Sequence, residues 1–228
     1  MRREFQFEAH PEKGKVSAVL LKPKDAMSLV VLGHGAGAGM YHSNMDSIAQ
    51  SLFERSIATL RYQFPFMERG GGRDSEKVSL ATVASAVIFA KSLARRFKSL
   101  KGLPIFAGGH SFGGRMTSLA AADSMLGELD GLIFFAFPLH APNKPSNHRA
   151  EHLSKIPVPM LFLSGSRDSL MDLDLFRPVL KKIRKTAKLH VIDTANHGYK
   201  VLKKIRNNSE SVFDEMGDVV DRWIRDLN

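Results

Sequence analysis

The stretch Ile105-Phe-Ala-Gly-Gly-His-Ser-Phe-Gly-Gly-Arg115 decides how this sequence folds. Its apolar start predicts a buried strand, and the small-residue run Met116–Ala122 that follows predicts a helix. Between them lies the pattern Gly109-x-Ser111-x-Gly113. A chain that turns sharply from a strand into a helix brings two backbones close together, and glycine leaves room for both. We therefore expect Ser111 at the apex of a strained turn, with its hydroxyl projecting from the end of a sheet.

Short apolar runs alternate with helical patterns along the rest of the chain. The expected strands are Phe5–Glu8, Val16–Leu21, Ser28–Leu32, Ile57–Tyr62, Ile105–Ala107, Leu132–Phe137, Pro159–Leu163 and Leu189–Ile192. Stripes at helical spacing, interpreted as core faces, are Met45, Ile48, Ala49, Leu52 and Phe53; Val83, Val87, Ile88 and Ala94; and Val212, Phe213, Met216, Val219, Val220, Trp223, Ile224 and Leu227. This alternation predicts an α/β fold, a mostly parallel central sheet with helices on both faces, formed by residues 1–228 as a single domain.

A serine nucleophile needs a base, and the sequence contains nine histidines. In α/β folds that carry such a turn, the order along the chain is serine, acid, histidine, and ligands bind beyond the carboxyl ends of the strands. His197 follows the expected strand Leu189–Ile192 in a loop at that edge, whereas His190 lies within the strand. We therefore predict His197 as the general base.

The acid is predicted by the same logic. Asp168 follows the expected strand Pro159–Leu163, where a carboxylate can fix the tautomer of the histidine. The end of the preceding strand, Phe137-Pro-Leu-His140, offers no carboxylate. Asp172 and Asp174 are alternatives, although they are typical of the first turn of a helix.

Acyl transfer also needs donors for an oxyanion. The amide of Phe112, directly after the serine, is one candidate. The glycine-rich loop His34-Gly-Ala-Gly-Ala-Gly39 offers the other, which we assign to Ala36. This loop lacks both the spacing of a dinucleotide motif and the Lys-Ser/Thr ending of a phosphate loop, so no cofactor is expected.

Several residues near these segments are candidates for substrate binding. Phe64, Phe66 and Met67 lie in the loop 63–72 and predict an apolar pocket wall, with burial beneath the loop as the alternative. The further candidates are His34, His110 and His140. Arg115 is expected in a structural ion pair, with contact to a substrate carboxylate as the lesser alternative.

His148-Arg-Ala-Glu-His152 matches a zinc-peptidase signature. The flanking Pro145 and Pro157 leave room for little more than two helical turns, so we interpret the segment as a surface helix and expect no metal site.

The composition limits the partners. The net charge of +10 could favour an anionic partner. However, the basic stretches 181–185 and 200–206 are expected on solvated helix faces or helix ends, with no interleaved aromatic residues for stacking bases. We expect no nucleic acid and, because no run approaches about 18 apolar residues, no membrane span. The absence of cysteine excludes a thiol nucleophile, and the amino terminus lacks the apolar run of a secretory signal, so a cytoplasmic location is expected.

The motifs resemble those of the α/β-hydrolase family. The matching segments are His34–Gly39, Phe64-Pro65, Gly109–Arg115, Gly165–Asp168 and Asn196-His197. They are most similar to the subfamily related to dienelactone hydrolases that includes the testis-expressed and NSL-complex hydrolase-like proteins. The resemblance implies a hydrolase core with little or no cap domain. Dienelactone hydrolases use a cysteine nucleophile, so that activity is not implied here.

The residues together predict a serine hydrolase that cleaves an acyl ester-type bond in a small-molecule substrate through an acyl-enzyme. The alternative is a non-catalytic scaffold of the same fold that binds an acidic partner through its basic surface. The sequence does not predict an oligomeric state.

Overall fold

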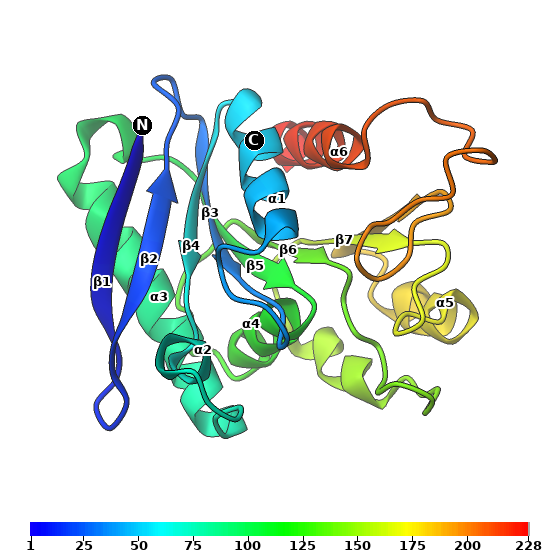
Figure 1. The fold of residues 1–228 in the computed structure, drawn as a ribbon, viewed down its shortest axis with the longest axis horizontal. Coiled ribbons are helices and arrows are strands. Elements are labelled where there is room, and N and C mark those ends of the chain that lie inside the picture. The colour runs from blue at the N-terminus through cyan, green and yellow to red at the C-terminus, as the bar shows by residue number, and fades with distance from the viewer. Residues whose placement is uncertain (228) are drawn as a thin grey trace.

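Eight strands form one twisted sheet in the computed structural model of this chain, which describes residues 1–227 (Figure 1). They are β1 (Arg2–His10), β2 (Gly14–Leu21), β3 (Ser28–Gly33), β4 (Ile57–Tyr62), β5 (Ile105–His110), β6 (Gly131–Phe135), β7 (Met160–Gly165) and β8 (Ala187–Ile192). Their spatial order is β1-β2-β4-β3-β5-β6-β7-β8. The hairpin β1–β2 is antiparallel and β2 runs antiparallel to β4, while all other neighbours pair in parallel. The predicted α/β fold is confirmed, and every expected strand is present.

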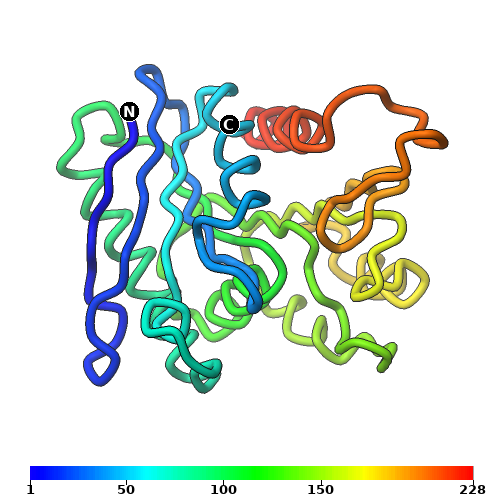
Figure 2. The backbone as a smooth tube through the Cα atoms, in the orientation of Figure 1, coloured from blue at the N-terminus to red at the C-terminus, as the bar shows by residue number. Residues whose placement is uncertain are grey.

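Helices cover both faces of the sheet, as Figure 2 also shows. They are α1 (Ser43–Glu54), α2 (Pro65–Arg69), α3 (Glu76–Arg96), α4 (Phe112–Ala122), α5 (Leu173–Lys182) and α6 (Val212–Leu227), with the short 3₁₀ helices η1 (Lys98–Leu100) and η2 (His148–Lys155). Helices α1 and α6 pack together on one face, and α3 and α4 on the other. Each face has its own hydrophobic cluster. The sheet therefore separates two cores.

The predicted helical stripes are largely buried, with two errors. Ile88 is 65% exposed, because the buried face of α3 runs through Val83, Val87 and Ala90 and the next residue after Val87 turns away from it. Leu227 is 40% exposed in the last turn of α6. The periodicity predicted the helices correctly, but it assigned two exposed residues to the buried faces.

Helix α3 is the one helix among residues 1–227 that is long and apolar enough, by length and composition, to cross a membrane. Half of its apolar window is buried, and it packs against β1 and α4. This packing is that of a core helix.

The basic stretches differ from each other. Lys181 and Lys182 are exposed in the last turn of α5, as expected. Residues 200–206 form a loop between β8 and α6, so the helical expectation is wrong there. Thr194 and Tyr199, both with positive φ, turn the chain out of β8 before this loop. Arg206 is also not solvated, because its side chain is 5% exposed and pairs with Glu215.

The carboxyl ends of the central strands meet at one edge of the sheet. Strand β5 lies between β3 and β6, with Gly109 opposite Gly33 and His110 opposite Phe135. Within residues 1–227, the connections above this edge consist of loops, α2 and η2, and none forms a separate cap domain.

Candidate active site

The turn from β5 to α4 has the strain that the sequence predicts. Ser111 has φ 50° and ψ −111°, a conformation that residues with a side chain rarely adopt. A Cβ on Gly109 would lie 2.2 Å from the carbonyl oxygen of Gly33, and one on Gly113 would lie 2.3 Å from the same backbone group. The Ser111 amide donates to Phe135 O at 2.8 Å and fixes the turn against β6. The two glycines thus allow β3 to pass directly beneath the serine.

The loop after β8 brings His197 to this serine. His197 Nε2 lies 2.8 Å from Ser111 Oγ. The loop is held in shape by Asn196, whose side-chain oxygen accepts the amides of Gly198 and Lys200 at 3.0 Å each. Asn44 on α1 donates to Gly198 O, also at 3.0 Å. The histidine is therefore positioned by contacts on both sides.

Asp168 lies on the far side of the imidazole. Its two carboxylate oxygens are 2.8 and 2.9 Å from His197 Nδ1, and Oδ1 also accepts the amide of Leu170 at 2.8 Å. The residue is 6% exposed. A Cβ on Gly165 would lie 2.2 Å from Ala195 O, so the loop that carries His197 crosses directly over the end of β7.

The two alternative acids lie elsewhere. Asp172 accepts the amides of Asp174 and Leu175 and caps the start of α5, as the helix-start interpretation predicts.

The hydrogen-bond partners of His197 determine the tautomer of its ring. A carboxylate only accepts hydrogen bonds, so Nδ1 of His197 carries the ring proton and donates it to Asp168. In the neutral ring with this tautomer, Nε2 carries no proton and can accept the Ser111 hydroxyl proton. The geometry brings together the three residues predicted as a triad, in the arrangement that proton removal from Ser111 by the neutral imidazole requires.

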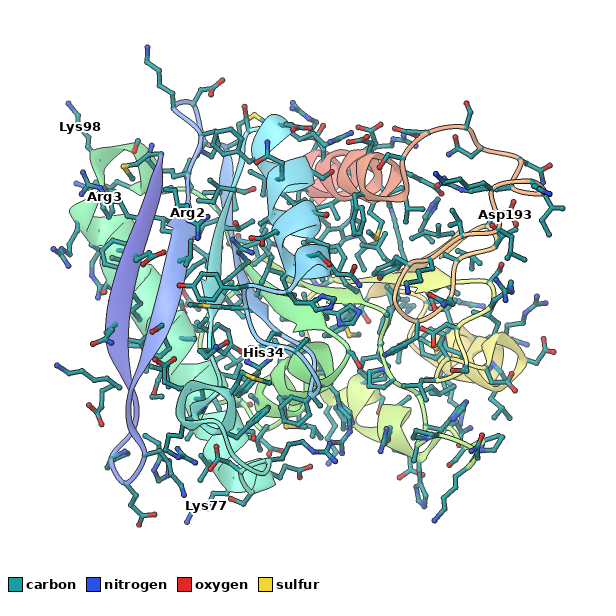
Figure 3. All side chains as sticks on the ribbon, viewed as in Figure 1. Arg2, Arg3, His34, Lys77, Lys98 and Asp193 are labelled. Atoms are coloured by element: carbon teal, nitrogen blue, oxygen red, sulfur yellow. The ribbon has the colours of Figure 1, made fainter. Side chains whose placement is uncertain are left out.

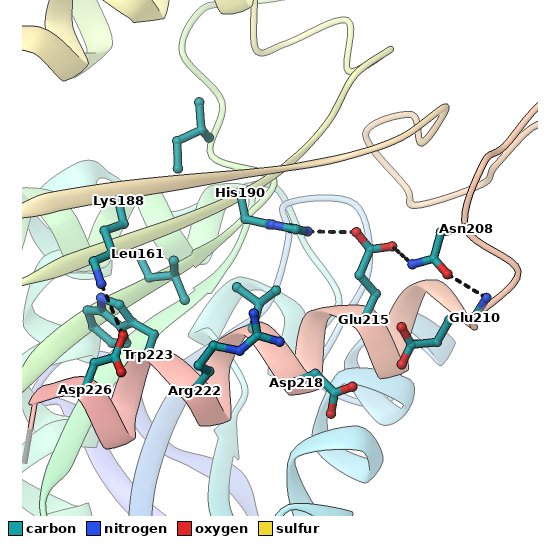
Figure 4. Close-up of a pocket in the computed structure, with 12 residues that line it drawn as sticks. Leu161, Lys188, His190, Asn208, Glu210, Glu215, Asp218, Arg222, Trp223 and Asp226 are labelled. Atoms are coloured by element: carbon teal, nitrogen blue, oxygen red, sulfur yellow. Dashed lines mark hydrogen bonds and ion pairs between the residues drawn. The ribbon is translucent and has the colours of Figure 1, made fainter.

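His190, the other histidine beyond Asp168, belongs to a different part of the molecule. Its Nε2 lies 2.7 Å from Glu215 Oε1, in a groove of about 400 Å³ between β8 and α6 (Figure 4). This groove contains neither Ser111 nor Asp168.

The predicted oxyanion donors flank the serine. Ala36, Ser111 and Phe112 line one cavity together. Phe112 begins α4, and the next amide, that of Gly113, donates to His34 O at 3.0 Å. Among residues 1–227, no hydrogen bond was found from the amide of Ala36 or of Phe112. Both amides are therefore available to a ligand.

Two cavities meet at Ser111. The larger, about 570 Å³, is lined by Ala36, Gly37, Arg73, Ser111, Phe112, Arg115, Pro138, Ala141, Pro142, Arg149 and Leu170. The smaller, about 280 Å³, is lined by Gly35, Ala36, Gly37, Ala38, His42, Asn44, Met45, His110, Ser111, His197 and Gly198. The serine and the two residues Ala36 and Gly37 belong to both.

The structure corrects the expectation for His34, which lines neither cavity. Its side chain is fully buried in the interior of the fold (Figure 3). Nδ1–H donates to Gly35 O at 2.7 Å, and Nε2 accepts the amide of Phe64 at 3.0 Å. Burial lowers the pKa of His34 to about 4. This neutral ring therefore ties the glycine-rich loop to the segment after β4.

The aromatic wall expected from the loop after β4 is also corrected, because burial beneath the loop prevails. Phe64 and Phe66 are buried and pack with Phe112 at ring separations of 5.1 and 5.8 Å. Met67 packs close to Gly39. None of the three lines a cavity at Ser111. They support the turn from beneath.

The two remaining residues predicted to bind substrate, His110 and His140, differ in whether they line a cavity. His110 lines the smaller cavity and its ring lies 5.6 Å from that of His197. Burial, and then the neighbouring His197, lower its pKa to about 4. His140 is 5% exposed and bonds to Ala141 O, so its ring is not part of either cavity wall. Its neighbours Pro138, Ala141 and Pro142 line the larger cavity instead.

Three arginines at the larger cavity were missed or underrated by the sequence analysis. Arg115 forms the expected ion pair, with Glu76 at 3.3 Å, but it also lines the cavity with Arg73 and Arg149. Arg149 lies within the candidate zinc signature, between its two histidines. Arg73 lies in a loop without a recognisable motif.

The zinc signature forms a 3₁₀ helix, in which residues three apart share a face. His148 accordingly pairs with Glu151 at 2.7 Å, while His152 lies 2.7 Å from Ser118 on α4. The two histidines point to different partners. Among residues 1–227 no group of three or more metal-binding side chains was found.

Solved structures share this fold along nearly the whole chain. The esterase domain of a Rhodothermus marinus protein is 15% identical, with a TM-score of 0.72 and 100% of both chains covered. A serine hydrolase without lid from Xanthomonas campestris is 16% identical, with a TM-score of 0.72 over 99% of this chain and 94% of that chain. Dienelactone hydrolase from Anabaena variabilis is 15% identical, with a TM-score of 0.69 over 99% and 98%.

At these identities the likeness shows the fold. A family model described as an alpha/beta hydrolase domain matches residues 26–225, well over half of the sequence. The chain therefore belongs to the alpha/beta hydrolase family.

Proposed function

We propose that this chain is a serine hydrolase that cleaves an acyl ester-type bond in a small-molecule substrate. One observation carries the proposal: the continuous hydrogen-bond chain from Ser111 Oγ through His197 to Asp168, at 2.8 Å for each shortest contact. Ser111 lies at a strained turn and is accessible from two cavities.

The first half-reaction forms an acyl-enzyme. Ser111 Oγ attacks the acyl carbonyl carbon while His197 Nε2 takes the hydroxyl proton. The carbonyl oxygen becomes an oxyanion, which accepts hydrogen bonds from the amides of Ala36 and Phe112. The bond from the carbonyl carbon to the leaving group then breaks, and His197 gives its proton to that group.

The second half-reaction returns the enzyme to its starting state. Water gives a proton to His197 Nε2 and attacks the acyl carbon, and the oxyanion forms again at the same amides. The bond to Ser111 Oγ breaks, and the proton returns to the serine. Throughout, Asp168 stabilises the imidazolium and keeps the ring oriented.

The names of the structural neighbours support an ester-type substrate. They include an esterase domain, a serine hydrolase and a dienelactone hydrolase. Esters, thioesters and lactones all expose a carbonyl that this constellation can attack. Because the sequence contains no cysteine and Ser111 lies at the strained turn, we propose an oxygen nucleophile for this chain.

A fluorophosphonate probe tests the proposal directly, because it reacts with serines activated by a neighbouring base. Wild-type protein should be labelled and should hydrolyse 4-nitrophenyl butyrate, and Ser111→Ala should abolish both. Ser99→Ala is a matched control, because Ser99 is exposed on η1, before β5 and so beyond the opposite end of that strand. Absence of labelling in folded wild-type protein would overturn the proposal and favour the non-catalytic scaffold.

A further inference from the structure

We propose that the larger cavity at Ser111 binds an anionic group on the acyl part of the substrate, a carboxylate or a phosphate. This inference rests on the proposed hydrolase function and specifies its substrate class. It would make the preferred substrate a half-ester or half-thioester: an acyl chain that carries the scissile bond at one end and an anion at the other.

The charge of the cavity wall is the first observation. Arg73, Arg115 and Arg149 approach the cavity from three segments: the loop before α3, helix α4 and helix η2. Among residues 1–227, none of those that line this cavity is an aspartate or a glutamate. Guanidinium groups present planar pairs of donors that match the two oxygens of a carboxylate or phosphate.

Unused donors on these arginines are the second observation. Arg115 Nε is buried and has no hydrogen-bond partner in the structure of residues 1–227. The pairing partner of Arg115, Glu76, has a side chain 56% exposed and contacts only one end of the guanidinium at 3.3 Å. Arg149 Nη1 donates to His140 O at 2.9 Å, and no bond was found for its other nitrogens in the same part of the chain. A buried unpaired donor is unfavourable, so an acceptor in this cavity would be stabilised.

The arginines also repel each other. Burial, followed by the positive charges of Arg115 and Arg73, lowers the pKa of Arg149, although a guanidinium remains charged at neutral pH. An anion among the three groups would relieve this repulsion. The cluster therefore favours a bound anion over an empty cavity.

A buried contact holds two of the arginines together. Ser118 on α4 donates to Arg115 O at 2.8 Å, and its oxygen lies 2.7 Å from His152 Nε2 on η2. Because the serine hydroxyl has a single proton, the histidine Nε2–H donates to it. This contact docks η2 against α4 and sets Arg149 beside Arg115.

The position of His197 indicates that the larger cavity holds the acyl part of the substrate. His197 lines the smaller cavity and protonates the leaving group, so the leaving group departs on that side. The acyl chain then extends into the larger cavity, where Phe112 and Ala36 hold the oxyanion. The wall of this cavity also includes Pro138, Pro142 and Leu170, whose apolar surfaces suit a short run of methylene groups.

Matched esters test this inference. The 4-nitrophenyl half-ester of glutaric acid should be hydrolysed with a kcat/KM at least about tenfold higher than the neutral 5-methylhexanoate ester, which has nearly the same shape, because one charge-assisted contact supplies about that factor. A 4-phosphonobutanoate ester distinguishes the two sources of the anion. Raising the salt concentration to 0.5 M should reduce the preference.

The arginine variants should remove the preference. We expect the ratio of the two kcat/KM values to fall toward one in Arg115→Gln and Arg149→Gln, and to persist in Arg177→Gln, an exposed arginine on α5. Because both esters are measured on the same preparation, the ratio does not depend on the folded fraction. Equal rates for both esters in wild type would overturn the inference while leaving the proposed function intact.

A binding measurement keeps the two proposals separate. Calorimetric titration of Ser111→Ala with glutarate and with inorganic phosphate should detect binding that weakens at least about tenfold when Arg149→Gln is added. Binding that is absent, or that survives the added substitution, would overturn the anion site. If binding is found but wild type hydrolyses neither ester, the proposed function fails and the anion site stands.

Discussion

Asp168 holds both of its carboxylate oxygens within 2.9 Å of a single ring nitrogen of His197. This arrangement selects the tautomer in which Nδ1 carries the proton. Asp168→Asn places an amide beside the ring, and an amide NH₂ favours the tautomer with Nδ1 unprotonated and Nε2 blocked. We expect kcat for an activated ester to fall about 10³- to 10⁴-fold, with little change in the melting temperature.

Asp172→Asn is the control for this substitution. Asp172 caps the start of α5 by accepting the amides of Asp174 and Leu175. Asparagine caps helices about as well as aspartate does. We expect activity within a factor of three of wild type. If Asp172→Asn were the inactive variant and Asp168→Asn the active one, the assignment of the acid would be wrong.

The amide of Ala36 is the second predicted oxyanion donor, and proline removes it. Ala36 has no positive φ, so the loop does not exclude a proline on that ground. Ala36→Pro should lower kcat about a hundred- to a thousandfold without a matching change in KM, because the donor acts in the transition state.

A neighbouring substitution tests whether loop stiffness alone explains such a loss. A Cβ on Gly37 meets no atom within 4 Å, and Gly37→Ala keeps the amide. It should reduce kcat less than tenfold. Equal losses in Gly37→Ala and Ala36→Pro would argue against the Ala36 amide as a donor.

The close approach at Gly113 predicts a loss of stability. A Cβ there would lie 2.3 Å from the backbone of Gly33, and backbone on both sides cannot yield as a flexible side chain can. We expect Gly113→Ala to lower the free energy of unfolding by about 3 kcal/mol, measured by urea denaturation. Gly71→Ala, where a Cβ meets nothing within 4 Å, should change it by less than about 0.5 kcal/mol.

The sequence predicted what depends on local pattern and chain order. The spacing of glycines around Ser111, the strand before it and the loop position of His197 each follow from residues close together in the sequence. The order of serine, acid and histidine then selected Asp168. The structure brings these three side chains into contact, and its strands match those expected.

The sequence did not predict which side chains line the cavities. Phe64 and Phe66 are apolar residues in a loop, and whether such residues face a ligand or the core depends on what packs beneath them, here Phe112 and His34. Arg73, Arg115 and Arg149 are distant in sequence and line one cavity because the fold places the loop before α3 near α4 and docks η2 on α4. Residues that come together in this way have no regular spacing in the sequence, so no pattern in a single sequence predicts their proximity.

The burial of His34 makes stability depend on pH. Its folded-state pKa of about 4 lies below the ordinary value of 6.5, so between these values the unfolded chain binds a proton that the folded protein excludes. The stability that the folded protein gains from the neutral His34 ring is fully present above pH 6.5 and is lost as the pH falls toward 4. Within this window one such group changes the free energy of unfolding by about 1.4 kcal/mol per pH unit.

Carboxylates also titrate in acid, so a difference between proteins isolates the histidine. His34→Gln should be less stable at pH 7, because a donor to Gly35 O and an acceptor for the Phe64 amide are disturbed. Near pH 5, however, its free energy of unfolding should fall less steeply than that of wild type, by up to about 1.4 kcal/mol per pH unit. Urea denaturation at half-unit steps from pH 4 to 7 measures both slopes. Parallel slopes for the two proteins would mean that the buried ring at position 34 does not exclude the proton, and that the loop carrying Ala36 is not held by a neutral histidine.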